Sequence, residues 1–125
     1  MIKQLLIVGL GGFLGSVARH LCNNWFKASS FPLSTFLVNG LGSFIIGVVL
    51  GYWLKTTTPS DNWRLFLATG ICGGFTTFSA FAFENLTLLR NGQYSYLFIN
   101  IIGSILLSLL LVWLGAMLGS KWATV

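Results

Sequence analysis

Long stretches without a charged residue dominate this chain and constrain its fold more than any other feature. Charged residues make up 7% of the 125 residues, against about 25% in soluble domains. A helix that crosses a bilayer needs about 20 apolar residues. The uncharged stretches are residues 4–18, 28–54, 65–83 and 91–120. The sequence therefore predicts an all-α membrane protein, a single membrane domain over residues 1–125, with transmembrane helices at about 2–24, 32–54, 63–89 and 94–119.

The basic residues do not indicate a nucleic-acid partner. The formal net charge is +5, but the seven Lys and Arg are scattered along the chain and form no stripe. Trp25, Trp53, Trp63 and Trp122 fall near predicted helix ends, as aromatic residues at a membrane interface do. The two cysteines give no disulfide framework and no metal-ligand spacing. We therefore interpret the basic residues and the Trp residues as interfacial anchors of a multi-pass membrane protein, and the cysteines as packing residues.

The third predicted helix contains a run that disfavours a continuous helix. Residues 70–81 read GICGGFTTFSAF, and paired glycines and threonines are poor helix formers. Within a bilayer, a loosened backbone is tolerated only where protein, or a cavity carrying water or ions, satisfies its polar groups. We therefore expect this helix to be broken near its centre, at a binding or permeation site.

Polar residues recur at helical spacing inside two other predicted spans. One stripe is Thr35, Asn39 and Ser43, and the other is Asn100, Ser104 and Ser108. Residues four apart lie on one face of a helix. Such residues commonly hold helices together, at about 0.6 kcal/mol for each hydrogen bond. Two stripes beside a broken helix favour a second interpretation, in which they are the walls of a narrow polar track.

The chemistry of this lining favours a small anion. A cation path usually carries Asp or Glu within the membrane, and here only Glu84 qualifies, toward the end of its span. The remaining groups are amide and hydroxyl donors and the positively polarised ring edges of Phe78 and Phe81. The Phe pair alone is equally typical of packing. Arg19 is open to three interpretations: an anion-attracting charge at a vestibule, a partner for Glu84, or a snorkelling interfacial residue.

The charges barely determine the orientation of the chain in the membrane. With an even number of crossings, both termini and the loop at residues 55–64 share one side. That side carries Lys3, Lys55, Arg64 and Lys121, whereas the other carries Arg19, Lys27 and Arg90. An excess of Lys and Arg normally marks the cytoplasmic side. The small difference permits insertion both ways up and a closed antiparallel dimer, although a single topology with weak charge signals fits as well.

Glycines spaced by four recur in three of the predicted spans. The pairs are Gly11 and Gly15, Gly47 and Gly51, and Gly115 and Gly119. This small-xxx-small pattern marks close contacts between membrane helices. It fits packing within one chain as well as packing between two copies.

Three motifs together resemble the Fluc (also called CrcB) fluoride channels, over essentially the whole chain. They are GGFLGSVAR at residues 11–19, TFLVNGLGSFIIG at 35–47 and the run at 70–81. The resemblance implies a dual-topology, antiparallel homodimer with two pores in the bacterial cytoplasmic (inner) membrane. It implies passive export of F⁻ that relieves fluoride toxicity, and no enzymatic activity.

The resemblance also implies roles for particular residues. A structural Na⁺ at the dimer centre would be held by the backbone carbonyls of Gly73 and Thr76. The ion pore would be formed by Asn39, Phe78, Phe81, Ser104 and Ser108, with Ser79 available beside the Phe pair. Carbonyls exposed at the ends of half-helices suit Na⁺, which makes the implied sodium site physically reasonable.

The chain departs from the family pattern at four positions. Ser16 stands where Ala is expected, His20 where Tyr is expected, and Ser34 where Gly usually precedes Thr35. Ala80 stands where Thr or Ser usually follows Ser79. The last departure removes a hydroxyl beside the Phe pair, which puts the contribution of that position to anion coordination in doubt.

Three other functions compete with a fluoride channel. A small multidrug-type proton/cation exchanger would need a membrane carboxylate, for which Glu84 is the candidate. An enzyme is disfavoured because two carboxylates and one His supply little acid–base chemistry, and the glycine run at 9–15 lacks the third glycine of a dinucleotide loop. A helper that only packs against partners would tolerate apolar replacement of both polar stripes.

Overall fold

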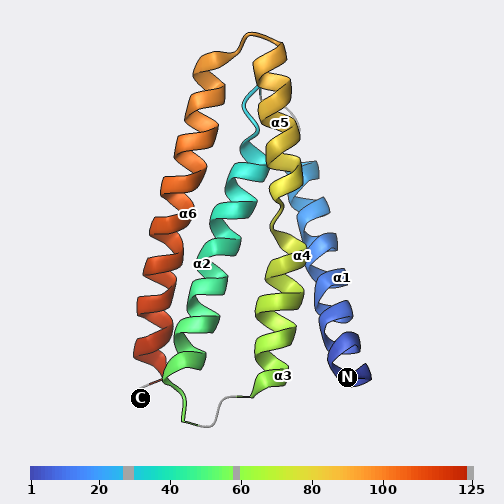
Figure 1. The fold of residues 1–125 in the computed structure, drawn as a ribbon, viewed down its shortest axis with the longest axis vertical. Helices are drawn as coiled ribbons and strands as arrows, with labels where there is room; N and C mark the ends of the chain where they lie inside the picture. Colours follow the sequence, from blue (N-terminus) through green and yellow to red (C-terminus); the bar gives the residue numbers. More distant parts are fainter. Residues whose placement is uncertain (27–29, 58–59, 124–125) are drawn as a thin grey trace.

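The computed structural model describes residues 1–26, 30–57 and 60–123, all of whose regular structure is helical. The helices in chain order are α1 (Ile2–Trp25), α2 (Leu33–Lys55), α3 (Asp61–Arg64), the π-helix η1 (Leu65–Cys72), α4 (Gly73–Phe75), α5 (Phe78–Arg90) and α6 (Tyr94–Trp122). Segments α3 to α5 follow one another along a single rod, Asp61–Arg90 (Figure 1). The predicted all-α class is confirmed.

Four helical rods are long and apolar enough to cross a membrane. They have 24, 23, 30 and 29 residues, and the shortest is about 35 Å long at 1.5 Å per residue. The hydrocarbon core is about 30 Å thick, so each of the four predicted spans corresponds to a helix that is long enough to cross it. Both termini lie at the same end of the bundle as the α2–α3 connection (Figure 1). Lys27, used above in the charge count, lies outside the described residues.

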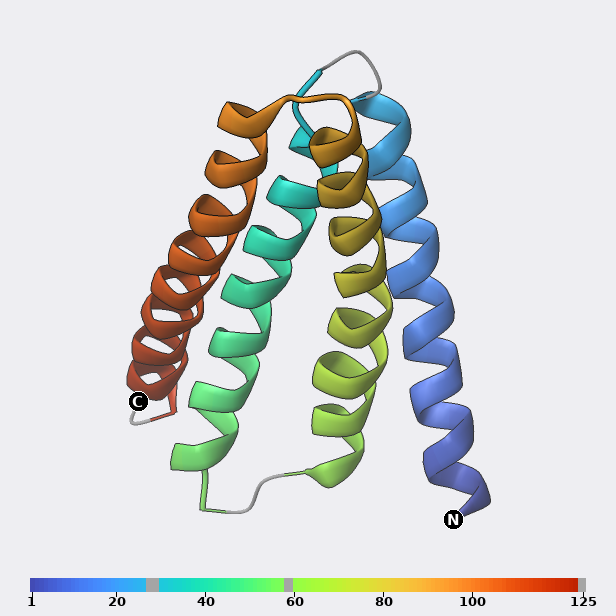
Figure 2. The same cartoon turned by 45° about the horizontal axis from the view of Figure 1, so that its top comes forward.

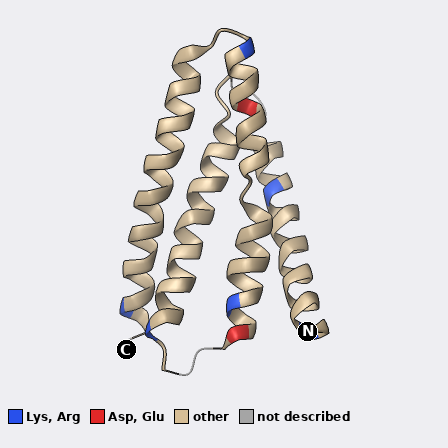
Figure 3. Ribbon diagram, viewed as in Figure 1, with Lys and Arg blue, Asp and Glu red and all other residues tan. Residues whose placement is uncertain are grey.

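Charged residues lie mainly toward the ends of the bundle, and most of its middle carries none (Figure 3). The described ion pair joins Arg64 Nε to Asp61 Oδ1 at 3.7 Å, within α3. This distribution is the one expected of a chain whose middle lies in hydrocarbon.

The rods associate as two close pairs, α2 with α6 and α1 with η1 and α4 (Figures 1 and 2). Glycines make these approaches possible. A Cβ added at Gly11 would lie 2.8 Å from Gly70 Cα, and one added at Gly15 would lie 2.8 Å from Phe75 N. The other two predicted pairs, Gly47 with Gly51 and Gly115 with Gly119, sit equally close to the backbone of the facing helix in the α2–α6 pair. Packing within one chain therefore accounts for all three glycine patterns.

Buried amides connect α5 to α6. Asn100 is 1% exposed, and its Nδ2 donates to Asn85 Oδ1 at 2.9 Å. Asn85 Nδ2 donates to the carbonyl of Phe81 at 2.9 Å, and Ser104 Oγ donates to Asn100 Oδ1 at 3.3 Å. Because an unpaired amide in hydrocarbon is costly, this chain of bonds fixes how the two helices face each other.

The third rod combines a feature that the sequence predicts with one that it does not. Regular helix stops after Phe75 and resumes at Phe78, inside the run expected to be broken. The eight-residue π-helix η1 before it was not predicted. At its end the Gly73 N–H donates to Ala68 O, five residues back. π-helical segments are rare and frequently lie at functional sites.

Candidate ion-binding site

The break in the third rod is formed by two threonines in extended conformation. Thr76 has φ −78° and ψ 157°, and Thr77 has φ −151° and ψ 120°. Thr76 closes α4, since both its N–H and its hydroxyl donate to Cys72 O, at 3.0 and 2.9 Å. Thr77 opens α5 as its N-cap, because its Oγ1 accepts from Ala80 N at 3.2 Å. The adjacent threonines therefore end one helix and start the next.

Asn39 on α2 satisfies the peptide groups that the break exposes. Its Nδ2 donates to Thr77 O at 3.0 Å, and its Oδ1 accepts from Thr77 N at 2.8 Å. In a continuous helix the Thr77 N–H would donate to the carbonyl of Gly73, four residues back. The side chain of Asn39 thus takes the place of a helical hydrogen bond and leaves the Gly73 carbonyl without that donor.

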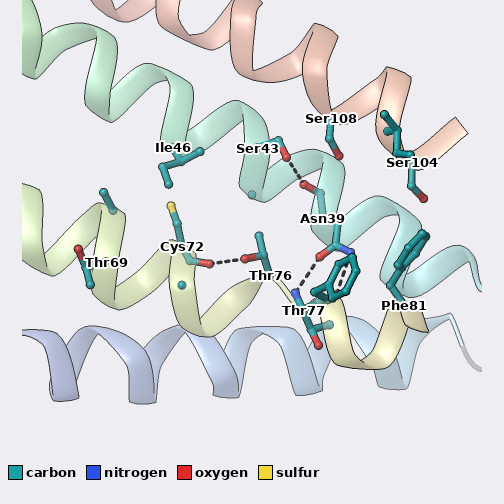
Figure 4. A pocket seen from close by; sticks show the side chains of 15 residues that line it. Asn39, Ser43, Ile46, Thr69, Cys72, Thr76, Thr77, Phe81, Ser104 and Ser108 are labelled. Atoms are coloured by element: carbon teal, nitrogen blue, oxygen red, sulfur yellow. Dashed lines mark hydrogen bonds between the residues drawn. The ribbon is translucent and has the colours of Figure 1, made fainter. Parts of the chain in front are cut away.

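A cavity of about 540 Å³ lies beside this break, between α2, the third rod and α6. Hydroxyls reach it from three elements: Ser43 on α2, Thr76 and Thr77 at the break, and Ser104 and Ser108 on α6 (Figure 4). No Asp or Glu belongs to the described residues that line it. A lining without carboxylates carries no fixed negative charge, which suits an anion better than a cation. The hydroxyls of Ser43, Thr76 and Ser104 donate to protein acceptors and present lone pairs to the cavity.

Most of the residues predicted for the site lie together around this cavity. They are Asn39, Gly73, Thr76, Phe78, Phe81, Ser104 and Ser108. Among the described lining residues, Ser79 and Arg19 do not appear. Ser79 is exposed, and its Oγ lies 3.3 Å from Thr77 Oγ1. Whether ions touch any of these residues stays a prediction.

The two Phe rings stand at the α5 side of the cavity, one turn apart. Their centroids are 5.7 Å apart, with an interplanar angle of 40°. Phe78 is 79% exposed, whereas Phe81 is half-buried. A large ring that a single chain leaves this open can contact lipid, an ion path or a second copy of the chain.

Side chains of α1 reach the break from the opposite side. Arg19 Nη1 donates to Thr76 O at 3.5 Å, and Ser16 Oγ donates to Gly74 O at 3.5 Å. Glu84 instead accepts from Thr35 Oγ1 at 2.5 Å, so Arg19 and Glu84 form no ion pair in the described structure. The interpretation of Arg19 as a partner for Glu84 is therefore wrong. The guanidinium sits beside the interrupted backbone.

Three departures from the family pattern acquire local partners. Besides the Ser16 contact, Ser34 Oγ lies 2.5 Å from Asn23 Oδ1, and His20 Nε2 lies 3.2 Å from Asn24 Nδ2. Ala80 supplies the backbone N–H that caps α5.

Sequence reasoning missed the half of the cavity that lies next to the π-helix. Ile46, Thr69 and Cys72 line it there (Figure 4). Thr69 and Cys72 are three residues apart in an apolar run, which gave no polar stripe to detect.

Comparison with known proteins shows the family of this chain. Residues 6–116 match the family model described as CrcB-like protein, Camphor Resistance (CrcB). A relative from Chlorobium luteolum is 45% identical, over 96% of this chain and 95% of its own length. One from Pyrococcus abyssi is 40% identical, over 96% of this chain and 98% of its own. Both are named fluoride-specific ion channel FluC, a name that describes a channel and not an enzyme. The chain therefore belongs to the CrcB family.

Proposed function

We propose that this protein is a fluoride-selective channel through which F⁻ passes passively. The observation that carries the proposal is the break at Thr76–Thr77, which Asn39 holds open beside a cavity lined by hydroxyls and phenyl rings. Relatives that share 40–45% of its residues are named fluoride-specific channels. Hydroxyl and amide donors, with the positive edges of aromatic rings, replace part of the water shell of a small anion.

The ion path in this proposal follows the cavity between α2, α5 and α6. Ser104 and Ser108 lie one turn apart on α6 and offer hydroxyls along the helix axis. Phe78 and Phe81 offer ring edges, and Ser79 a further hydroxyl beside them. Arg19 acts from the α1 side by raising the local positive potential, as an attracting charge does at a pore entrance.

The direction of flow follows from acid–base chemistry and the membrane potential. HF crosses membranes as a neutral acid and dissociates in a less acidic cytoplasm, where the anion is trapped. A negative interior then drives F⁻ outward through an open pore, at about 2.3 kcal/mol per charge for each 100 mV. We place the protein in the bacterial cytoplasmic membrane, where such export relieves fluoride toxicity.

An antiparallel homodimer completes the proposal. Lys3, Lys55, Arg64 and Lys121 belong to one end of the bundle, and the near balance with the other end supports insertion in both orientations. The 79% exposure of Phe78 supports a second copy at this face, because a pore ring needs a surrounding wall. Two inverted copies would then build two pores around a two-fold axis.

A structural Na⁺ at the dimer centre fits the residues present only in part. The Gly73 carbonyl has lost the Thr77 donor to Asn39, which leaves a hard oxygen free to bind a cation. The Thr76 carbonyl lies 3.5 Å from the Arg19 guanidinium and would share its oxygen with that charge. When bound, the ion would link carbonyls of the two copies. Replacing Na⁺ by N-methylglucamine during purification should lower the unfolding temperature, and an unchanged temperature would speak against the site.

The decisive experiment is anion efflux from liposomes that contain the purified protein. Fluoride- and chloride-selective electrodes record release after a potassium ionophore sets the potential. We expect rapid F⁻ release and no Cl⁻ release above that of protein-free liposomes. Equal release of both anions, or of neither, contradicts the proposal.

A proton/cation exchanger is the second candidate, because of Glu84. Its Oε2 is buried and has no hydrogen-bond partner among the described residues, and a membrane carboxylate is what such exchangers use. An imposed pH gradient should then drive accumulation of a lipophilic cation, and Glu84→Gln should abolish it. If the protein is a channel, neither the unchanged protein nor the Glu84→Gln variant accumulates the cation.

A further inference from the structure

A second cavity lies at the end of the bundle that carries the termini, far along the third rod from the break. It has a volume of about 420 Å³ and is lined by the last turns of α2, by α3 and the start of η1, and by the end of α6. Its walls are rich in aromatic residues: Tyr52, Trp53, Trp63 and Trp122. Val48, Val49 and Leu67 make the rest largely apolar, and Arg64 contributes a cation.

Two hydrogen-bond donors on residues that line this cavity are buried and have no acceptor among the described residues. They are Trp53 Nε1 and Arg64 Nε. The guanidinium carbon of Arg64 lies over the Trp53 ring, 4.7 Å from its centroid. Buried donors without acceptors cost about 1–3 kcal/mol each. Because one of the two donors is cationic, an anion is the acceptor that would satisfy them best.

The carboxylate of Asp61 does not fill this need. Its Oδ1 lies 3.7 Å from Arg64 Nε, beyond hydrogen-bonding distance, and its side chain is 69% exposed. Asp61 is also absent from the described residues that line the cavity. The ion pair is therefore too long for a hydrogen bond, and Arg64 Nε has no acceptor among the described residues.

The position of the cavity selects the kind of anion. It lies where α2 ends at Lys55 and α6 ends at Trp122, at the level at which a membrane helix meets lipid headgroups. A headgroup phosphate carries the negative oxygens, and its acyl chains can lie along the apolar walls. Basic pockets between helices at this depth commonly bind anionic lipids.

We propose that this cavity binds an anionic phospholipid, whose phosphate accepts hydrogen bonds from Arg64 and Trp53 while its acyl chains pack against Val48, Val49 and Leu67. This site is separate from the ion path and does not depend on what the protein conducts. In an antiparallel dimer it would occur once in each leaflet.

Native mass spectrometry of the full chain in detergent, titrated with phosphatidylglycerol, tests the proposal. Arg64→Gln should weaken binding about tenfold or more, since it removes a charged hydrogen-bond donor. Trp53→Phe keeps an aromatic ring but removes the indole N–H, and should weaken binding about threefold to tenfold. The matched controls, Arg90→Gln and Trp25→Phe, lie at the other end of the bundle and should stay within about twofold.

Two further arms separate a lipid from a free anion and from a misfolded variant. Two competitors lack acyl chains: glycerophosphoglycerol, which is the free headgroup, and inorganic phosphate. Added at a concentration equal to the dissociation constant of the lipid, neither should displace it. Displacement by either would overturn the assignment to a lipid, as would equal binding by all variants. Arg64→Lys keeps the charge and should recover part of the affinity if Arg64→Gln loses binding through the charge. If Arg64→Gln fails to fold, the comparison of Trp53→Phe with Trp25→Phe decides.

Discussion

The side-chain amide of Asn39 pairs with the peptide group of Thr77 through two hydrogen bonds, 2.8 and 3.0 Å long, in opposite directions. This pairing copies the geometry by which two backbone segments satisfy each other. It explains how an interrupted helix persists inside a bilayer, where water cannot solvate the exposed peptide. Asn39 is thus a structural support of the break as well as a lining residue of the cavity.

Replacing Asn39 by Ala should destabilise the protein and close the path beside it. Both polar groups of the Thr77 peptide would lose their partner, at a cost of about 2–4 kcal/mol in the free energy of unfolding. The break would then rearrange, so fluoride efflux from liposomes should fall to the protein-free level. The unfolding temperature in detergent and the efflux rate measure the two effects.

Ser43→Ala is the matched control for this change. The Ser43 hydroxyl lines the same cavity but donates at 2.7 Å to the carbonyl of Asn39 within its own helix. Its loss leaves the Thr77 pairing intact and should cost less than about 1 kcal/mol. If Asn39→Ala proves no less stable than Ser43→Ala, the pairing contributes nothing to holding the break.

The sequence was sufficient to predict the main lines of this fold because the membrane leaves few alternatives. Charge-free stretches predict membrane spans directly. The Gly and Thr run at 70–81 predicts a break, since such poor helix formers are tolerated in hydrocarbon only where other groups satisfy the loosened backbone. Two members of each stripe, Asn39 with Ser43 and Ser104 with Ser108, line the same cavity, because four-residue spacing fixes one helix face. Thr35 and Asn100 instead bond to side chains of α5, as polar residues that hold helices together do.

Other features depend on contacts that a single helix pattern does not encode. The π-helix η1 lies in an ordinary apolar run, at the place where Gly70 packs against Gly11 of α1. Arg19 was open to three interpretations because its partner, the Thr76 carbonyl, is 57 residues away. The glycine pairs were equally ambiguous until the structure showed which helices they bring together.

Replacing Phe78 by Ile should slow fluoride efflux about tenfold or more, equivalent to about 1.4 kcal/mol in the barrier. An aliphatic side chain of similar size keeps the apolar surface but loses the positive ring edge. Phe83→Ile is the control, because Phe83 is 70% exposed on the same helix but is absent from the described lining of the cavity. Equal rates for the two variants would show that the Phe78 ring only packs.

The buried amides Asn85 and Asn100 should be energetically coupled. Asn100→Leu alone leaves Asn85 Oδ1 without its donor, and should cost about 1–3 kcal/mol in the free energy of unfolding. Replacing both by Leu removes the unpaired group and should recover about 0.6–1.7 kcal/mol relative to the sum of the single changes. A double-mutant cycle of unfolding in detergent measures this coupling. Strict additivity would show that the bond seen between them has no energetic weight.

Two glycines of α1 should respond oppositely to Ala. A Cβ at Gly15 would lie 2.8 Å from Phe75 N and closer still to Ile71 O, so Gly15→Ala must push α1 away from η1 and α4, at about 1–3 kcal/mol. A Cβ at Gly9 meets nothing within 4 Å, so Gly9→Ala should raise helix stability by up to about 1 kcal/mol. Unfolding temperatures of the two variants in one detergent give the comparison. If Gly15→Ala matched or exceeded Gly9→Ala in stability, the close approach of α1 to the third rod would not exist in solution.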